Sequence, residues 1–498
     1  MPAAAKTCGT YVRSTATFIP RQGETGPKFP RMGDRSGSVP AMALRVPLSA
    51  EILLARAAAG LSRMAGAGGG TTVPGKLLWK LDPGAVDRLA ARLPAGSALI
   101  SATNGKTTSS AMAARILGPW YELAHNHSGA NLVSGVASAL LASPGAQLGL
   151  FEVDEGALPE VARRVRPRAV CLGNLFRDQL DRYGELELVA GRWRETVSAL
   201  PDGAALVVNA DDPQVGDLSR ERPAATFGLD DRRHSSPGLQ HAADSKWCVR
   251  CGTPYTYAAA YIGHLGDYRC ESCGHARPAL DVAARRIELN GLDSVSFDLD
   301  TPEGSRRVEL GVPGLYNVYN ALGAAALCRA LGSDLETIAA GLQGFSAAFG
   351  RFERIPIGDR SLLVLLIKNP AGANEVVRTL VAGGAPKLLV IALNDEIADG
   401  RDVSWIWDVD FEPLLGGLER LVATGERAAE LALRFKYAGL PAEQIEVVTE
   451  LERALDRGLE QTPPGSELVT LPTYTAMLAL RDLVARRGFV KQYWERAA

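Results

Sequence analysis

Short apolar runs alternate with longer stretches of helical periodicity from Ala95 onward. A helix is predicted over Ser109–Leu117, and the apolar runs predict buried strands at Ser97–Ser101, Leu148–Val153, Ala169–Gly173 and Ala204–Asn209. Strands that alternate with helices indicate a parallel sheet with helices on both faces. Such sheets bind ligands at the carboxyl ends of their strands, and polar clusters follow several of these runs.

A second α/β pattern begins past Arg354, with strands predicted at Ser361–Ile367, Lys387–Leu393, Arg420–Thr424 and Leu468–Leu471. Within the first pattern, which runs to about Phe345, residues 240–280 have little helical periodicity and contain four cysteines. We therefore predict a central α/β domain over residues 46–350, with an insertion at 240–280, and a smaller C-terminal α/β domain over residues 351–498.

Residues 1–45 are rich in Pro, Gly and Ser and show no apolar period. This composition predicts a disordered tail, or a start codon mistakenly placed upstream of Met42. From Ala50 to Met64, apolar residues recur among charged ones, which predicts an amphipathic helix.

The composition is that of an ordinary globular protein, with 46% hydrophobic and 22% charged residues and a formal net charge of -2. This balance gives no indication of a nucleic-acid or anionic-membrane partner. No run approaches the ~18 apolar residues of a membrane-spanning helix, and the N-terminus lacks the apolar core of a secretory signal. We expect a cytoplasmic protein whose seven cysteines are reduced thiols or metal ligands.

A candidate phosphate-binding loop lies between the first predicted strand and the helix that follows it. Phosphate binding needs converging backbone N–H groups, a helix N-terminus and a mobile cation. Gly105 permits close approach, Lys106 is the cation, and the Thr107 hydroxyl is a candidate Mg²⁺ ligand. The alternative is an ordinary helix N-terminus with a solvated lysine. The full candidate set is Thr103, Asn104, Gly105, Lys106, Thr107 and Thr108.

Acidic residues follow a second strand, in the segment Glu152-Val153-Asp154-Glu155. Carboxylates at a strand's carboxyl end, close to a phosphate loop, are natural ligands for Mg²⁺. A solvated acidic loop is the alternative, and it would be preferred if no phosphate loop lay nearby.

Two Cys-x-x-Cys pairs are separated by 18 residues, which is the spacing of a four-thiolate zinc site. The predicted ligands are Cys248, Cys251, Cys270 and Cys273. Glycine follows each pair, at Gly252 and Gly274, as tight knuckle turns require. Four thiolates leave no open position, so the site should be structural, and His264 and His275 are expected to face solvent. The alternative is four unrelated thiols.

Two segments of the C-terminal pattern follow predicted strands and allow two interpretations. Acids and tryptophans gather from Asn394 to Asp410, and Lys368–Gly372 is also polar. Each is either a catalytic or docking loop, or a solvated loop. If the segment from Asn394 to Asp410 is a solvated loop, its tryptophans cap a core.

These motifs together resemble the Mur ligase family over about residues 45 to 485. Thr103–Thr108 matches the family's ATP loop, and Asn209-Ala210-Asp211-Asp212 and the segment from Tyr316 to Ala321 match central-domain signatures. The resemblance implies that Asn320 faces the adenine, that Glu155 holds Mg²⁺, and that Arg351 approaches the nucleotide phosphates.

Within that family, the four-cysteine insertion and the C-terminal segments resemble the MurT subfamily, the synthetase subunit of lipid II isoglutaminyl synthase. The matching segments are Lys368–Gly372, Asn394-Asp395, Asp399–Asp408 and Pro472–Thr475. The resemblance implies a heterodimer with a GatD-type glutaminase, which supplies ammonia from a Cys–His pair. Asp402 matches the position that completes the partner's triad.

The implied activity is ATP-dependent amidation of the D-glutamate α-carboxyl in lipid II at the inner face of the membrane. ATP, Mg²⁺ and a structural Zn²⁺ are the implied cofactors. One alternative is a Mur-type ligase that joins an amino acid to a carboxyl substrate. Another is a non-enzymatic zinc-ribbon scaffold that binds nucleotide or nucleic acid.

Overall fold

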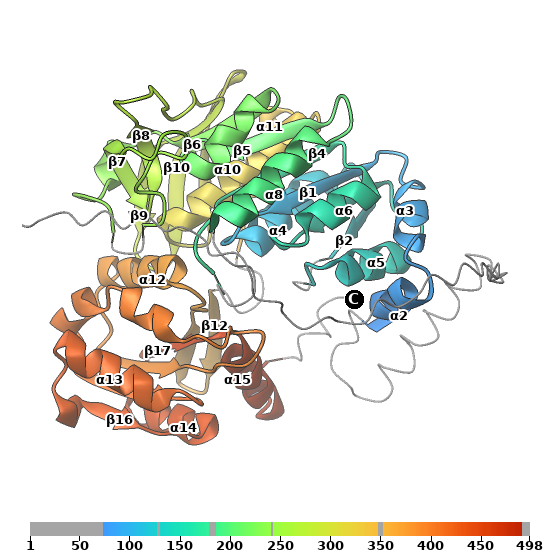
Figure 1. Cartoon of the computed structure of the whole chain (residues 1–498). Coiled ribbons are helices and arrows are strands. Elements are labelled where there is room, and N and C mark those ends of the chain that lie inside the picture. Colours follow the sequence, from blue (N-terminus) through green and yellow to red (C-terminus); the bar gives the residue numbers. More distant parts are fainter. Residues whose placement is uncertain (1–72, 127–129, 179–185, 241–242, 347–351, 491–498) are drawn as a thin grey trace, which may run out of the picture. The chain divides into compact units, whose positions relative to one another are not determined.

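The computed structural model describes residues 73–126, 130–178, 186–240, 243–346 and 352–490. The tail predicted over residues 1–45, the helix predicted at Ala50–Met64 and the candidate Arg351 lie outside these ranges. Within them, the strands form two large sheets and one two-stranded sheet (Figure 1). The first large sheet belongs to what we call the central region, and the second to the C-terminal region.

The sheet of the central region has nine strands among the described residues, and most of them are parallel. The order is β11-β10-β9-β6-β5-β4-β1-β3-β2, with antiparallel pairing only at β9-β10 and β10-β11. The predicted parallel sheet is therefore confirmed. Its strands are β1 (Ser97–Ser101), β2 (Leu123–His125), β3 (Leu148–Glu152), β4 (Ala169–Leu172), β5 (Ala205–Asn209), β6 (Ala224–Leu229), β9 (Val282–Asn290), β10 (Ser294–Thr301) and β11 (Gly304–Leu310).

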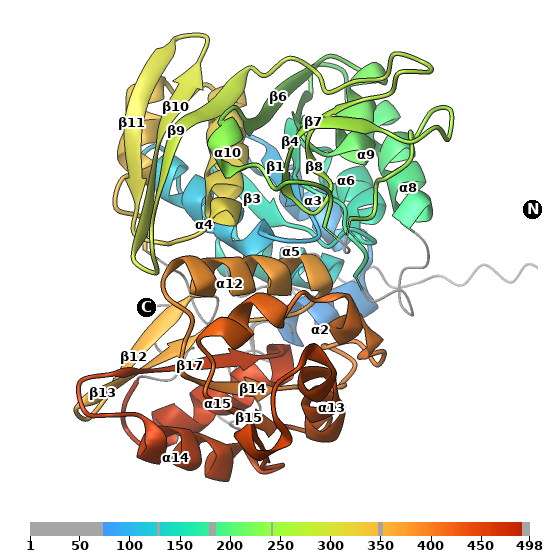
Figure 2. The same ribbon diagram turned by 90° about the vertical axis from the view of Figure 1, so that its left-hand side faces the viewer.

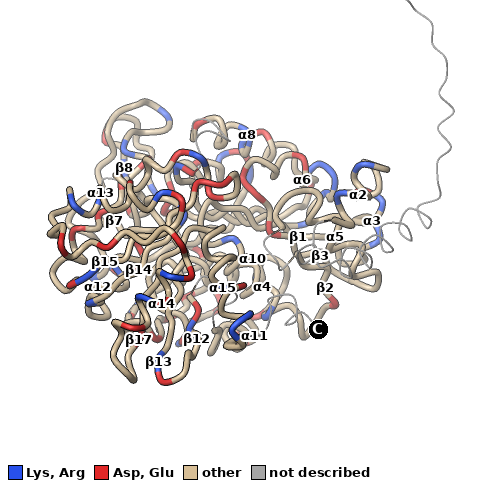
Figure 3. The backbone as a smooth tube through the Cα atoms, turned by 90° about the horizontal axis from the view of Figure 1, so that it is seen from below, with Lys and Arg blue, Asp and Glu red and all other residues tan. Residues whose placement is uncertain are grey.

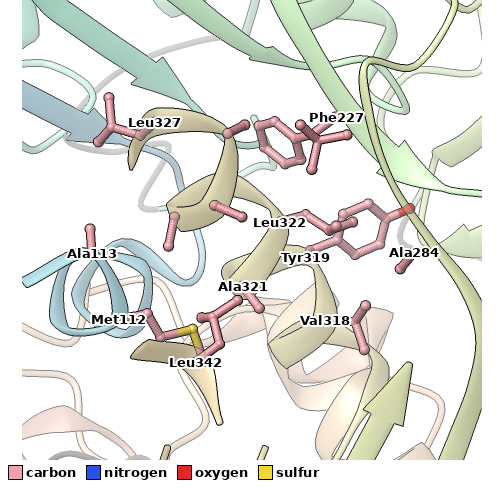
Figure 4. Close-up of a cluster of buried hydrophobic side chains, with 14 of the residues drawn as sticks. Met112, Ala113, Phe227, Ala284, Val318, Tyr319, Ala321, Leu322, Leu327 and Leu342 are labelled. Atoms are coloured by element: carbon pink, nitrogen blue, oxygen red, sulfur yellow. The ribbon is translucent and has the colours of Figure 1, made fainter. Parts of the chain in front are cut away.

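Helices cover both faces of this sheet (Figure 1). One face packs α4 (Lys106–Leu117), α10 (Leu315–Ala330) and α11 (Leu335–Leu342). In Figure 4, Met112 of α4, Ala321 of α10 and Leu342 of α11 point toward one another. The other face packs α2 (Val73–Leu81), α3 (Ala85–Ala90), α5 (Val133–Ala142), α6 (Leu158–Val165) and α8 (Leu186–Ser198).

The helix α10 can be Ala- and Gly-rich because it lies tightly against the sheet. A Cβ added at Gly323 would come 3.3 Å from the Phe227 ring and 3.6 Å from Cys171 Sγ. Cys171 and Cys328 are both buried in this core, as predicted.

The insertion forms a small ribbon of its own. Its hairpin is β7 (Thr256–Ile262) and β8 (Leu265–Arg269), and single bridges join Trp247 to Pro254 and Arg269 to Ala276. The short helices α9 (Pro213–Gly216), η1 (Asp217–Arg220) and η2 (Arg232–His234) precede it.

The sheet of the C-terminal region has six described strands in the order β12-β13-β17-β14-β15-β16, and only β12-β13 is antiparallel (Figure 2). All four strands predicted here are present, although β13 ends earlier than expected. The strands are β12 (Glu353–Ile357), β13 (Arg360–Val364), β14 (Leu388–Ala392), β15 (Arg420–Thr424), β16 (Ile445–Val447) and β17 (Glu467–Pro472). The helical segments are α12 (Pro370–Ala382), η3 (Ser404–Asp408), η4 (Glu412–Gly416), α13 (Ala428–Ala438), η5 (Ala442–Gln444), α14 (Leu451–Gln461) and α15 (Tyr474–Arg486).

Candidate functional site

The candidate phosphate loop follows β1 directly and leads into α4, which begins at Lys106, three residues before the predicted start. Gly105 has φ +87°, a conformation that disfavours side chains. A Cβ at this position would also lie 1.9 Å from Asn320 Oδ1. Glycine is therefore required here twice over, and the structure places Asn320 against the phosphate loop.

Lys106 is buried and folds back over the loop. Its Nζ donates to the backbone oxygens of Ala102 and Thr103 and to Glu155 Oε2, the last at 2.7 Å. Burial alone would raise the pKa of Glu155, but the ammonium groups of Lys106 and Lys368 hold this pKa below its usual range. The carboxylate is thus ionised and stands beside the loop cation.

A second acid, Glu152, faces the loop from the end of β3. The Thr107 hydroxyl donates to Glu152 Oε2 at 2.8 Å. Asp154, by contrast, accepts from the backbone N–H of Gly156 at 3.1 Å and helps to form the turn. Of the acidic segment, Glu152 and Glu155 therefore lie at the loop. Thr108 lies in the first turn of α4 and is partly exposed.

Asn174 supports the loop from below and was missed by the sequence reasoning. Its Oδ1 accepts from Asn104 N at 2.9 Å, and its Nδ2 donates to Asn104 O at 3.0 Å. The Thr103 hydroxyl accepts from Phe176 N at 3.1 Å. Asn174 follows the end of β4, where the rule for parallel sheets places polar ligands, so its position was the available signal.

The Lys368–Gly372 segment also reaches the phosphate loop. Asn369 Nδ2 donates to Asn104 Oδ1 at 3.0 Å, and Asn104 Nδ2 donates to Asn369 Oδ1 at 3.3 Å. Lys368 forms an ion pair with the buried Asp178. The interpretation of this segment as a solvated loop is therefore wrong.

The four predicted metal ligands converge in the ribbon. Their sulfur atoms all lie within 4.8 Å of one another, with Cys248 and Cys273 separated by 3.5 Å and Cys251 and Cys270 by 3.4 Å. The Thr253 hydroxyl near Cys251 Sγ and the Thr253 backbone lower the pKa of that thiol to about 6. Gly252 and Gly274 have φ of +72° and +73°, as the predicted knuckle turns require. The cluster could hold a metal ion.

The prediction that His264 and His275 face solvent is wrong, because the ribbon packs both rings against the central region. His264 is 0% exposed and lies 4.6 Å from the Phe176 ring, with Nε2 3.4 Å from Asp212 Oδ2. His275 Nδ1 lies 2.7 Å from the Tyr255 hydroxyl within the ribbon, and its Nε2 lies 3.7 Å from Asp217 Oδ1 of η1. Both histidines therefore hold the ribbon in place and lie away from solvent.

Within the loop from Asn394 to Asp402, Asp399 and Asp402 lie in different surroundings. Asp399 is buried and accepts from the Thr475 hydroxyl and from Thr475 N. Asp402 is exposed, and its Oδ1 accepts from Ser404 N at 2.8 Å. Hydrogen bonds from Ser404 hold the pKa of Asp402 below its usual range, so its carboxylate is ionised and open to solvent.

The tryptophans after this loop divide between the two interpretations. Trp405 packs partly buried against the hydrophobic core of the C-terminal region. Trp407 is exposed, and its ring centroid lies 5.8 Å from that of Tyr437. One ring therefore caps the core, and the other is displayed on the surface.

Charge and hydropathy give no further site. Basic and acidic residues are interspersed along the described backbone (Figure 3). Across the ranges that the structure covers, every helix is too short or too polar to cross a bilayer.

Solved structures with similar folds are Mur-type ligases. A pseudomurein peptide ligase type C from Methanothermus fervidus has a TM-score of 0.64 at 22% identity, with 80% of each chain covered. MurF from Acinetobacter baumannii has a TM-score of 0.60 at 20% identity, covering 82% of this chain and 80% of that one. The family described as Mur ligase middle domain matches residues 100–248. The fold is thus that of the Mur-type ligases.

Proteins with similar sequences identify the family within the Mur-type ligases. The family described as MurT ligase C-terminal matches residues 366–477. A protein of Streptococcus pneumoniae strain R6, named lipid II isoglutaminyl synthase (glutamine-hydrolyzing) subunit MurT, is 34% identical over 87% of this chain and 95% of its own length. A protein of the same name from Staphylococcus aureus strain N315 is 32% identical over 87% of this chain and 97% of its own. The chain belongs to the MurT family.

Proposed function

We propose that the chain is the synthetase subunit of a lipid II isoglutaminyl synthase and amidates the α-carboxyl of D-glutamate in the stem peptide to D-isoglutamine. The observation that carries the proposal is the buried Lys106 at a strand–loop–helix junction, held 2.7 Å from Glu155. The names of the relatives supply the substrate class.

ATP activates the carboxyl group in this reaction. The α-carboxylate attacks the γ-phosphorus, the bond from that phosphorus to the bridging oxygen breaks, and ADP leaves. Ammonia then attacks the acyl carbon, loses a proton and expels phosphate. Lys106 and the backbone N–H groups of the Thr103–Thr108 loop stabilise charge on the transferring phosphoryl group. Asn320, placed against the loop, and Arg351 complete the proposed nucleotide set.

Mg²⁺ fits the residues at the end of β3, because two carboxylates and a hydroxyl offer oxygen ligands there. Glu155 and Thr107, together with Glu152, would hold the ion. It would neutralise phosphate charge during transfer.

Asp402 is the residue proposed to complete the triad of a GatD-type glutaminase in a heterodimer. An ionised, exposed carboxylate can accept a hydrogen bond from the partner's histidine and orient its ring. Asp399 is unsuited to this role because both of its oxygens already accept hydrogen bonds from Thr475. Of the other two acids in the loop, Asp395 is paired with Arg427 at 2.7 Å, and Glu396 is exposed.

Zn²⁺ is the ion proposed for the ribbon, since four thiolates that all lie within 4.8 Å of one another fit a closed tetrahedral site. Its role is structural. We propose that the enzyme works in the cytoplasm at the inner face of the membrane, where it would meet a lipid-linked substrate.

The test first omits the partner. The purified chain is incubated with ATP, Mg²⁺, lipid II and an ammonium salt, and the stem peptide is examined by mass spectrometry. ATP-dependent conversion of one carboxyl to an amide, lost in Lys106→Ala, is the expected result. If neither ammonium nor glutamine with the partner yields an amide, or if an amino acid is joined instead, the proposal is wrong.

A further inference from the structure

Lys368 and Asn369 stand at the junction between the C-terminal region and the phosphate loop. They precede α12, and Asn369 is the N-cap of that helix, because its Oδ1 accepts from Gly372 N at 2.9 Å. The α12 helix is held in place further along by Arg378, which donates to Tyr261 O at 2.7 Å and to Ser236 Oγ at 3.1 Å. Both residues are therefore fixed in position by a helix anchored to the central region.

The Asn369 side chain aligns this junction with the loop. It exchanges two hydrogen bonds with the Asn104 amide, at 3.0 and 3.3 Å, and it is buried. Asn174 holds the backbone of Asn104 from the opposite side. These hydrogen bonds fix the backbone at Asn369, and therefore at the neighbouring Lys368, relative to the phosphate loop.

Lys368 occupies that position and joins the charges around the loop. Its ammonium pairs with Asp178, and it also lowers the pKa of Glu155, which in turn pairs with Lys106. Both Glu155 and Lys106 act on the pKa of Asp178. The four groups therefore form one cluster with two cations and two carboxylates.

The two cations differ in exposure. The Lys106 side chain is 5% exposed, whereas that of Lys368 is 32% exposed, so Lys368 is the cation that is open to solvent. Its partner Asp178 is buried, and burial raises the pKa of that carboxyl. Asp178 Oδ1 is buried and has no hydrogen-bond partner among the residues that the structure describes. Lys368 thus offers a partly exposed charge that Asp178 retains beside the loop.

We propose that Lys368 is a second cation of the phosphoryl-transfer site, delivered by the C-terminal region and directed at the terminal phosphate of the nucleotide. Asp178 holds its ammonium in readiness, and the Asn104–Asn369 amide pair sets its distance from the loop. The proposal rests on the proposed function, from which it takes the nucleotide as ligand. The sequence left this segment with two interpretations, and its place beside Lys106 decides for the catalytic one.

The experiment measures binding of ATP and of ADP to the full chain by isothermal titration, without lipid II. Lys368→Met should weaken ATP binding about tenfold or more, as loss of a hydrogen bond to a charged group does, and ADP binding by much less. Lys368→Arg should restore most of the ATP affinity. Lys387→Met is the matched control, because Lys387 lies in the same region, is 78% exposed and pairs with Glu419; it should bind as the wild type does.

A double variant distinguishes two possible roles of Lys368: direct contact with the phosphate, and neutralisation of the Asp178 charge. Combining Lys368→Met with Asp178→Asn removes the unpaired buried charge and should restore thermal stability, while ATP binding stays weak. Full recovery of ATP affinity in the double variant would overturn the proposal, as would an equal loss for ATP and ADP. Normal nucleotide binding by the wild type with no amidation of lipid II would reject the proposed substrate and leave this inference standing.

Discussion

The phosphate loop of the central region and the 394–402 loop of the C-terminal region both follow a parallel strand, but they treat their charged groups differently. Lys106 and Glu155 are buried and paired within the chain. Asp402 is exposed, and its carboxylate accepts a hydrogen bond from the neighbouring Ser404. The first loop carries its own counterions, whereas the second displays an acid that is suited to a group on another molecule.

Hydrogen bonds within the C-terminal region hold the 394–402 loop in the conformation that exposes Asp402. Asn394 Nδ2 donates to the Thr475 hydroxyl at 3.1 Å, its backbone N–H donates to the Thr473 hydroxyl at 3.0 Å, and Asp399 bonds Thr475. The motif residues around Asp402 therefore fix the loop to the start of α15. The comparison separates the residues that hold this loop, such as Asn394 and Asp399, from the exposed carboxylate of Asp402.

The largest expected effect on activity is at the phosphate loop, whose charged groups are paired within the chain. Lys106→Met should lower both ammonium-dependent and glutamine-dependent amidation about 1000-fold or more, because a cation acts on the transferring phosphoryl group in both. The variant leaves Glu155 buried and unpaired, so its thermal unfolding is compared with that of a double variant that also carries Glu155→Gln. If the double variant folds normally and regains activity, the role assigned to Lys106 is wrong.

Asp402→Asn should separate the two activities. Glutamine-dependent amidation by the complex should fall about 100-fold or more, while ammonium-dependent amidation by the chain should stay within about twofold. Asp399→Asn is the informative companion, since it should lower the melting temperature by loosening the loop. Equal losses with ammonium and with glutamine for Asp402→Asn would contradict the partner-facing assignment.

Loss of metal from the ribbon should lower the stability of the chain and leave the chemistry of the phosphate loop and of the 394–402 loop unchanged. Stripping the metal with a chelator should lower the melting temperature by roughly 5–15 °C, because a tightly bound ion stabilises only the folded chain. Cys270→Ser should already have the lower value and should not respond to chelation. Elemental analysis should give one zinc per chain. A ribbon that contains no metal and melts independently of chelator would count against a zinc site.

The smallest expected effect compares two glycines. Gly105→Ala should cost roughly 1–3 kcal/mol more than Gly203→Ala, because both have positive φ but only Gly105 adds a contact with Asn320. At Gly203, with φ +79°, no described atom lies within 4 Å of an added Cβ. Urea unfolding of both variants measures the difference. Similar values for the two would mean that Asn320 moves aside without cost.

Much of the fold was readable because strands and helices in this chain leave strong patterns. The four strands predicted for each region are all present, since continuous apolar runs such as Arg420–Thr424 are what a parallel sheet buries. The cysteine cluster was equally readable, because its spacing fixes its geometry. Local pattern therefore predicts elements and local sites well.

The sequence reasoning failed where a contact joins distant segments. His264 packs against Phe176 and Asp212, which are distant in the sequence, so the residues around His264 do not predict its burial. Lys368 lies 190 residues from Asp178 in the sequence, so the residues around Lys368 could not show that the two side chains form an ion pair. Asn174 carried a weak signal through its place after a strand, but asparagine is common in loops.

The hydrogen bonds between Asn104 and Asn369 span 265 residues of chain, which has a consequence for synthesis on the ribosome. At about 5–20 residues per second, Asn369 is made roughly 13–53 s after Asn104. The nascent central region can form its sheet and its ribbon in that interval, but the amide of its loop has no partner yet. The nucleotide site is therefore finished late in translation, after the helix that closes it has been synthesised.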